Sequence, residues 1–287
     1  RQAHFGRAAE TCAISQPALS AQIAALETAI GHQLFERGAR QVRLTTFGEQ
    51  FGIRARSILR EAEALADMAR GAGGSALGRL RIGVIPTIAP YLLPSVIGHI
   101  TAAHPEIDLL VRETMTHKLI EELGDGKLDC AIVALPVSEP SLTEVALFDE
   151  AMVLVRPADD AHRPVPDMDT LGQMKLLLLE EGHCFRDQAL SFCALRNTLP
   201  REGLDGSSLS TLVQMVGAGI GVTLIPEMAV PVETRSAHVS IAPMGAPYPK
   251  RTVGMVWRKT SALSQQLEAI AALVREAAAT HPAFAAR

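Results

Sequence analysis

The chain has 287 residues, of which 48% are hydrophobic and 4% aromatic, with one Trp, four Cys and a net charge of −4. This length allows two or three domains with a sizeable core. Four cysteines in so long a chain exclude a secreted disulfide scaffold, and we find neither a secretory signal nor an apolar run of transmembrane length. We therefore expect a cytoplasmic protein without membrane contact, in a sequence trimmed before Arg1, since it lacks an initiator Met.

The charge is distributed unevenly along the chain. Residues 1–70 carry nine basic and seven acidic residues, net +2, whereas residues 71–287 carry eighteen basic and twenty-four acidic residues, net −6. The positive net charge of the first segment suits an N-terminal module that faces the phosphates of a nucleic acid.

Residues 1–48 predict short helices around a turn. Ser15 is a candidate N-cap, Gly31 ends the helix, and apolar residues at spacings of three and four give it one core face. The opposite face carries small residues with short polar neighbours. Such a face lets a helix enter a major groove, where Gln can pair with adenine. The arginines that follow this helix suit a wing that contacts the phosphates of the DNA backbone. The candidate DNA-binding residues are Ser15, Gln16, Pro17, Ala18, Ser20, Gln22, Arg37, Arg40 and Arg43.

Residues 49–70 predict one helix with a narrow apolar seam that alternates at spacings of four and three. A lone helix with such a seam needs a partner, so we expect dimerisation; packing on its own domain is the alternative. The glycines of residues 71–79 predict a hinge.

From residue 80 the pattern alternates between strands and helices. Strands at 80–85, 107–112 and 128–133, with helices between them, predict a parallel sheet. A second unit begins near 151, with strands at 152–156 and 176–179. A strand at 252–257 and a helix at 264–279 close the chain. Thr87 and Thr116 both follow strands, so both hydroxyls are candidates for one cleft.

Two cysteines, Cys184 and Cys193, stand nine residues apart. Gly182 precedes the periodic run, so Cys184 is expected in the first turn of a helix, where His183 and Arg186 can add positive charge that lowers a thiol pKa. In a helix the two α-carbons would be about 13 Å apart, but a disulfide needs about 7 Å or less. Disulfide formation would therefore unwind the segment, as in an oxidation switch.

The cysteines also have other interpretations. Cys184 and Cys193 can be small core residues, as free cysteines often are, and Cys12 and Cys130 lie in apolar patterns that indicate core positions. A metal site at His183, Cys184 and Cys193 would lack a CxxC pair and a nearby fourth ligand.

The N-terminal motifs resemble the winged helix-turn-helix of LysR-type transcriptional regulators. The resemblance rests on Phe5, Ala8-Ala9, Ser15-Gln16-Pro17-Ala18-Leu19-Ser20, Leu34-Phe35-Glu36-Arg37 and Leu44-Thr45. Two features depart from the family pattern: the first part of the first helix is missing, and Ala24 and Ala25 stand where the family is often basic.

The two α/β units resemble the effector domain of this family, which is similar to periplasmic solute-binding proteins. Segments 85–94, 126–130, 182–193 and 207–209 resemble its peroxide-sensing members. The implied fold class is α/β. Its parts are a winged helix-turn-helix (1–48), a dimerisation linker helix (49–70), a hinge (71–79) and an effector domain (80–287), with subdomain I at about 80–150 and 254–287 and subdomain II at about 151–253.

The resemblance implies a DNA-binding activator of oxidative-stress genes that is switched by a reversible Cys184–Cys193 disulfide. Cys184 would be the peroxidatic and Cys193 the resolving thiol. Thr87, Thr116 and His183 would position hydrogen peroxide, with Arg186 and Asp187 tuning the site. The implied partners are double-stranded promoter DNA, a homodimer through 49–70 within a homotetramer, RNA polymerase, and a thiol reductant for reset, with no cofactor and no metal.

Alternatives remain for individual residues and for the function. Arg186 can be a surface charge, and Thr116 can be a helix cap. A LysR-type regulator that senses a small metabolite in the effector cleft, and a thiol peroxidase, are the rival functions.

Overall fold

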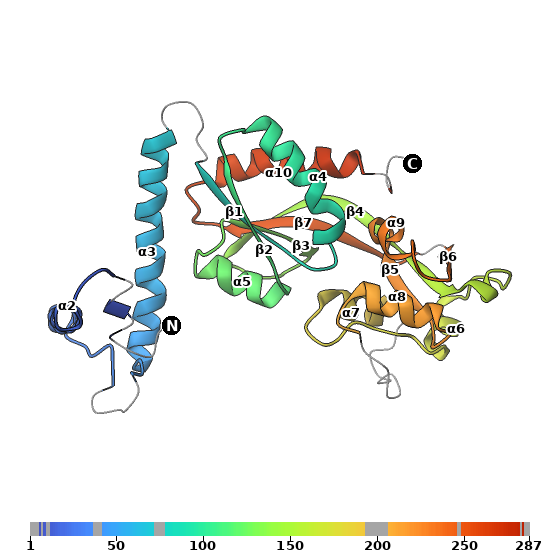
Figure 1. The fold of residues 1–287 in the computed structure, drawn as a ribbon, viewed down its shortest axis with the longest axis horizontal. Coiled ribbons are helices and arrows are strands. Elements are labelled where there is room, and N and C mark those ends of the chain that lie inside the picture. Colours follow the sequence, from blue (N-terminus) through green and yellow to red (C-terminus); the bar gives the residue numbers. More distant parts are fainter. Residues whose placement is uncertain are drawn as a thin grey trace. The chain divides into compact units, whose positions relative to one another are not determined.

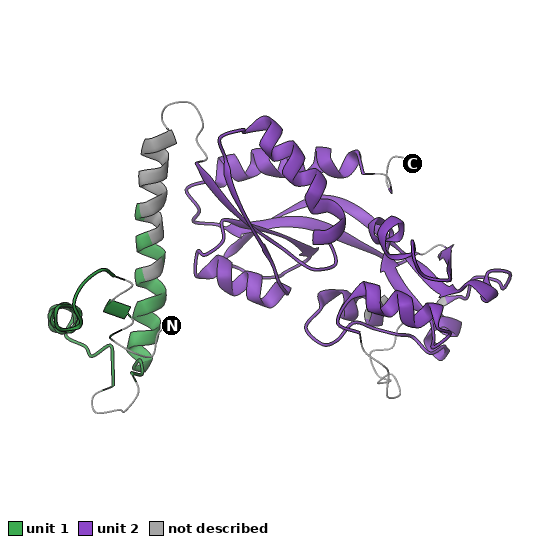
Figure 2. Ribbon diagram, in the orientation of Figure 1, with its two compact units in different colours: residues 1–64 green, residues 65–287 purple. Residues whose placement is uncertain are grey.

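The computed structural model describes residues 6, 8–9, 12–36, 42–71, 78–192, 206–245, 248–281 and 283. The chain divides into two compact units, residues 1–64 and residues 65–287 (Figure 2). Within the described residues, no helix has both the length and the apolar character needed to cross a membrane.

In the first unit, helix α2 (Gln16–Ile30) begins and ends where the sequence predicts. The Ser15 side chain accepts a hydrogen bond of 3.3 Å from the Ala18 backbone N–H, which caps the helix. Gly31 ends it with φ +72°, a left-handed conformation that favours glycine. An antiparallel bridge between Phe35 and Leu44 marks the base of the predicted wing, whereas Arg37 and Arg40 lie outside the described residues.

Two predictions about burial in this unit need correction. The predicted core face of α2 is only partly covered, since Leu19 and Ile23 are half-buried and Leu26 is exposed. Cys12, predicted as a core residue, is exposed because it lies in the turn before α2 rather than on an apolar helix face. The next helix, α3 (Thr46–Gly71), starts three residues earlier than the predicted linker helix.

The second unit is built on one mixed sheet in the order β2-β1-β3-β7-β4-β5, with β6 also paired to β4. Its strands are β1 (Arg79–Val84), β2 (Asp108–Glu113), β3 (Cys130–Leu135), β4 (Leu142–Pro157), β5 (Thr223–Pro226), β6 (Val239–Pro243) and β7 (Lys250–Arg258). Its α-helices are α4 (Ala89–Ala103), α5 (Thr116–Gly124), α6 (Met168–Gln173), α7 (Cys184–Phe192), α8 (Leu209–Gly217), α9 (Val230–Glu233) and α10 (Ser264–Ala279), with short 3-10 turns at Ala158–Asp160 and Glu227–Ala229.

The parallel sheet that the sequence predicts is present only in part. Strand β1 pairs in parallel with β2 and β3, but β7 runs antiparallel to β3, and β5, β6 and β7 all run antiparallel to β4. The predicted strand at 176–179 makes only isolated bridges, from Leu176 to Val222 and from Leu179 to Gly206.

Strands β4 and β7 lie side by side and connect the two lobes of the unit: β4 continues from its pairing with β7 to its pairing with β5 and β6, and the chain returns from β6 through β7 (Figure 1). We call β1–β3 with α4, α5 and α10 the first lobe, and β5, β6 and α6–α9 the second lobe. The sequence predicts a strand only at 152–156, whereas β4 has 16 residues. Acidic residues at Glu144, Asp149 and Glu150 interrupt its apolar pattern, which hides the first half of the strand.

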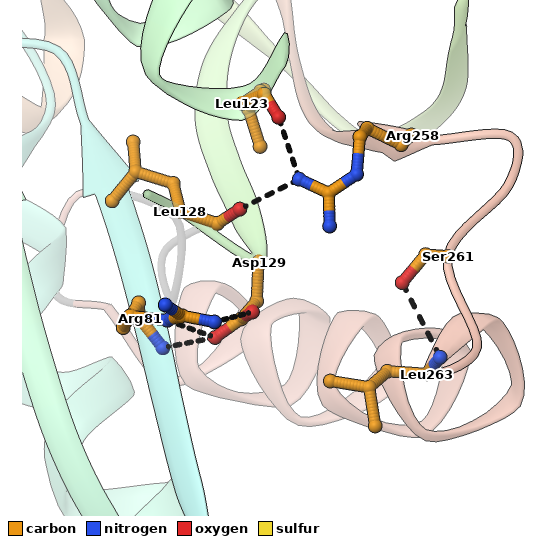
Figure 3. Close-up of polar contacts among 7 residues, drawn as sticks. All are labelled: Arg81, Leu123, Leu128, Asp129, Arg258, Ser261 and Leu263. Atoms are coloured by element: carbon orange, nitrogen blue, oxygen red, sulfur yellow. Dashed lines mark hydrogen bonds and ion pairs between the residues drawn. The ribbon is translucent and has the colours of Figure 1, made fainter. Parts of the chain in front are cut away.

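Charged side chains fasten the strands of the first lobe (Figure 3). The buried Asp129 carboxylate accepts hydrogen bonds from the Arg81 backbone N–H at 2.8 Å and from its guanidinium at 2.8 and 3.1 Å. Arg258, at the end of β7, donates to the carbonyl oxygens of Leu123 and Leu128. These bonds fix β1 to the start of β3, and the end of β7 to the end of α5 and the turn that follows it.

Candidate functional site

Cys184 is the first residue of helix α7, as the sequence predicts. Gly182, two positions earlier, has φ +96°, a left-handed conformation that a residue with a side chain would adopt only with strain. This turn brings His183 into the interior and leaves the Cys184 thiol half-buried at the helix N-terminus.

A small cavity brings the predicted residues of both lobes together. The first lobe contributes the loop after β1 and the start of α5, and the second lobe contributes the turn into α7. The lining residues are Ile85, Pro86, Thr87, Met115, Thr116, Gly182, His183, Cys184 and Phe185. The space inside is about that of one water molecule. Thr87 and Thr116, placed in one cleft by the sequence prediction, lie with Cys184 in this cavity.

Thr87 is held by a buried ion pair that the sequence analysis missed. The Arg251 guanidinium donates 2.8 Å to Thr87 Oγ1 and 2.9 Å to the Thr87 carbonyl oxygen. It also pairs with Glu150 at 2.8 Å, with both side chains 0% exposed. Burial raises the pKa of the Glu150 carboxyl, and Arg251 opposes that shift. Because a guanidinium only donates, Thr87 keeps its hydroxyl hydrogen for an acceptor in the cavity.

The pair was missed because its partners are 101 residues apart in the sequence. The available signal was that each charged residue stands just before a predicted strand: Glu150 before 152–156 and Arg251 before 252–257. The Arg251 guanidinium carbon also lies 5.5 Å from the centre of the Phe185 ring, next to Cys184. A buried cation therefore packs on the side chain of the residue that follows Cys184.

Thr116 is the first residue of α5, after Met115, and its side chain makes no capping bond. The alternative interpretation of Thr116 as a helix cap is therefore wrong. Its Oγ1 is buried with no hydrogen-bond partner among the described residues. A buried hydroxyl without a partner costs about 1–3 kcal/mol, so this group is suited to a ligand that supplies the missing bond.

His183 is 6% exposed, and burial lowers its pKa from the ordinary value, with Glu180 acting weakly in the other direction. It is neutral at neutral pH, so it does not supply the positive charge that the sequence predicts beside Cys184. Neither Arg186 nor Asp187 lines the cavity. Arg186 instead donates 2.8 Å to the Leu179 carbonyl oxygen, and Asp187 is exposed.

The lobes are also joined by a second buried contact. Tyr91 on α4 donates 2.7 Å to Glu233 Oε1, and Ser210 on α8 donates 2.6 Å to Glu233 Oε2. Burial, and then Glu233, raise the pKa of the Tyr91 phenol, which stays protonated as the donor. The inter-lobe space here is filled by the protein's own side chains.

Of the other three cysteines, Cys12 is exposed, Cys130 is a core residue and Cys193 is outside the described chain. Cys130 is fully buried, as predicted, and burial raises the pKa of its thiol. Cys193 lies outside the described residues, so its pairing with Cys184 stays a prediction. Among the described residues, no group of three His, Cys, Asp or Glu side chains is placed to hold a metal ion.

Two family models match the chain. Residues 73–279 match the LysR substrate binding domain, and residues 1–49 match the bacterial regulatory helix-turn-helix protein of the lysR family. The chain is 42% identical over 274 residues to the DNA-binding transcriptional dual regulator OxyR of Escherichia coli K12, covering 95% of this chain and 90% of that protein. It is 39% identical over 278 residues to the hydrogen peroxide-inducible genes activator of Haemophilus influenzae, covering 95% and 91%.

Solved structures give the same relationship. Full-length OxyR from Pseudomonas aeruginosa, with a cysteine changed to aspartate, is 37% identical, with a TM-score of 0.77 over 96% of this chain and 90% of that one. A hydrogen-peroxide-bound OxyR from Corynebacterium glutamicum, with a cysteine changed to serine, is 36% identical, with a TM-score of 0.72 over 99% and 90%.

Proposed function

The chain belongs to the LysR family of bacterial transcriptional regulators, and we propose that it senses hydrogen peroxide through Cys184 and activates oxidative-stress genes. The observation that carries the proposal is the buried Thr116 hydroxyl, which has no hydrogen-bond partner among the described residues and belongs to a residue that lines the same cavity as Cys184. A peroxide oxygen in that cavity would supply the missing bond. The cavity is small, which suits a small ligand such as hydrogen peroxide.

The first chemical step is a two-electron oxidation of Cys184. Its thiolate attacks one peroxide oxygen, the S–O bond forms as the O–O bond breaks, and the other oxygen leaves as hydroxide, which takes a proton to become water. The Thr87 and Thr116 hydroxyls and the neutral His183 ring would hold the peroxide and stabilise the departing oxygen. Arg186 and Asp187 stay assigned to the surroundings of Cys184 rather than to the peroxide.

The second step joins Cys184 to Cys193. The Cys193 thiol attacks the sulfenic sulfur, an S–S bond forms, and the oxygen leaves as water with the thiol proton. If the helix extends to position 193, the two α-carbons are about 13 Å apart, so the helical turn has to unwind before the bond forms. Unwinding of α7 would change the second lobe, and a thiol reductant would reverse the switch.

The DNA-binding assignment rests on the first unit. Helix α2 exposes Gln16, Ser20 and Gln22, and Arg43 is exposed next to the wing bridge. We assign residues 1–48 to binding of double-stranded promoter DNA in the cytoplasm, 71–79 to the hinge and 80–287 to sensing, with activation through RNA polymerase.

The oligomer assignment rests on helix α3. This helix exposes Ile53, Ile58 and Leu59, which are 45%, 67% and 64% exposed. Apolar residues at these exposures favour pairing of residues 49–70 with a second copy, in a homodimer that assembles into a homotetramer.

The test is intact mass and peptide mapping after one equivalent of hydrogen peroxide. The expected result is a loss of two hydrogens that maps to Cys184 and Cys193 and is reversed by thiol. Cys184→Ser should abolish the response and keep DNA binding, whereas Cys130→Ser should respond like the unmodified chain. Unmodified Cys184 at this dose would overturn the proposal, and sustained peroxide turnover with a thiol would indicate a thiol peroxidase instead.

A further inference from the structure

The two lobes meet at the cavity through Met115 and Gly182. Met115 comes directly before α5 in the first lobe, and Gly182 comes before α7 in the second. A Cβ atom placed on Gly182 would lie 3.0 Å from Met115 Sδ and 4.0 Å from Met115 Cε. The thioether therefore packs against Gly182, and a side chain at position 182 would crowd it.

Met115 is a wall of the cavity that is also open to solvent. It lines the cavity with Cys184 and Thr116, yet its side chain is only half-buried. The residue after Thr116, His117, is exposed and approaches the same point of Gly182, with Cε1 3.8 Å from the added Cβ. Met115 thus lies on the rim of the cavity, partly exposed to solvent and lining the same cavity as Cys184.

We propose that Met115 makes the site selective for hydrogen peroxide over alkyl hydroperoxides, an inference that rests on the proposed function. In hydrogen peroxide each oxygen carries one hydrogen and no carbon substituent. In tert-butyl hydroperoxide, a quaternary carbon replaces one of these hydrogens. With the attacked oxygen near Cys184 and the hydroxyl of Thr116, that carbon has to project through the rim, where the thioether lies against Gly182.

The two oxidants undergo the same chemistry at sulfur. The Cys184 thiolate takes one oxygen from either peroxide to give the sulfenic acid, with water leaving from hydrogen peroxide and tert-butanol from the alkyl peroxide. Any difference in rate between them therefore reports access and positioning at the rim.

The experiment measures second-order rate constants for Cys184 oxidation in the full chain. The reduced protein is mixed with hydrogen peroxide or tert-butyl hydroperoxide, quenched with an alkylating agent, and analysed by the mass of the Cys184 peptide. The variants are Met115→Ala, which removes the thioether, and Met115→Leu, which keeps an apolar side chain of similar volume. Met174→Ala is the matched control, a methionine that is 36% exposed and does not line the cavity.

In the unmodified chain, hydrogen peroxide should react faster than the alkyl peroxide. Met115→Ala should reduce the ratio of the two rate constants about tenfold or more, because shape exclusion of a few carbon atoms has that magnitude. Met115→Leu and Met174→Ala should keep the ratio. An unchanged ratio in a folded Met115→Ala, as judged by its thermal unfolding, would overturn the inference, as would an equal fall in Met115→Leu.

Failure of the proposed function would look different. In that case Cys184 of the unmodified chain would not react with hydrogen peroxide, whatever the ratio. A fast reaction with hydrogen peroxide together with an unchanged ratio in Met115→Ala would leave the sensor function standing and remove only the role of Met115.

Discussion

Arg251 fixes Thr87 through two hydrogen bonds, one of 2.8 Å to its hydroxyl oxygen and one of 2.9 Å to its carbonyl oxygen. Arg251 lies near the start of β7, one of the two strands that connect the lobes, and Thr87 belongs to the loop after β1 in the first lobe. The same guanidinium is paired with Glu150 on β4, the other strand that joins the lobes. The orientation of a cavity hydroxyl is therefore tied to the strands that connect the two lobes.

Arg251→Met should strongly destabilise the second unit. It leaves Glu150 buried without its cation, and breaking a buried pair in this way costs about 3–5 kcal/mol. The measurement is denaturant unfolding of the full chain, with the transition of residues 65–287 followed through the buried Trp257.

The double variant Arg251→Met with Glu150→Gln should recover part of that loss, since the amide removes the charge and still accepts from the Met228 backbone N–H. Lys250→Met is the control, because Lys250 pairs with Asp149 at 2.7 Å on the exposed surface, where such pairs add little. If Arg251→Met and Lys250→Met lowered the free energy of unfolding equally, the buried pair would contribute no more to stability than the exposed one.

Thr116→Val should affect reactivity and stability in different ways. The rate of Cys184 oxidation by hydrogen peroxide should fall, by up to about a hundredfold, since the transition state loses one positioned hydrogen-bond donor. The free energy of unfolding should stay the same or rise slightly, because the variant removes a buried hydroxyl that no described residue bonds.

Thr101→Val is the matched control for this change, since Thr101 is exposed on α4 and bonds only to backbone carbonyl oxygens of its own helix. It should leave the oxidation rate unaltered. A Thr116→Val variant that kept the full rate would remove Thr116 from the peroxide site, whatever its stability.

His183 should make stability depend on pH. Burial lowers its pKa in the folded chain, so between that pKa and the unfolded value of about 6.5 the unfolded chain binds more protons. The contribution of His183 to the free energy of unfolding is thus fully present above pH ~6.5. It declines as the pH falls through the pKa of His183 in the unfolded chain and then through its pKa in the folded chain. Denaturant unfolding at several pH values from neutral to mildly acidic measures this slope.

His183→Gln should lose that part of the slope, whereas His238→Gln, a change at an exposed histidine, should retain it. If both variants kept the slope of the unmodified chain, the loss of stability in acid would come from other groups.

Arg43→Ala and Gln16→Ala should weaken promoter binding in different ways. Loss of a phosphate contact at Arg43 should lower affinity for all sequences and reduce the salt dependence by about one counterion. Loss of a base contact at Gln16 should reduce discrimination between promoter and random DNA by about 1–3 kcal/mol and leave the salt dependence unchanged. Titrations of both DNAs across a range of salt concentrations measure the two effects.

Arg235→Ala, an exposed arginine in the second lobe, is the control for loss of one positive charge. If it matched Arg43→Ala in both respects, the effect would come from net charge rather than from a contact at the wing.

The amino-acid sequence by itself determined the features that depend on near neighbours. Ser15 caps α2 and Gly31 ends it, and Gly182 leads into a helix that starts at Cys184. Strands β1, β2 and β3 form a parallel sheet, and the strand ends bring Thr87 and Thr116 to one cavity. These features follow from local backbone preferences and from periodicity, which a single sequence displays.

Only the tertiary structure decided which groups are buried together. It paired Arg251 with Glu150 across 101 residues, made His183 neutral by burial rather than cationic, left Cys12 exposed, and extended the predicted strand 152–156 back to Leu142 as β4. It also left the Thr116 hydroxyl without a partner in the described part of the chain, and set Met115 against Gly182. Desolvation and contact depend on residues that are distant in the chain, so neighbouring residues give no measure of them.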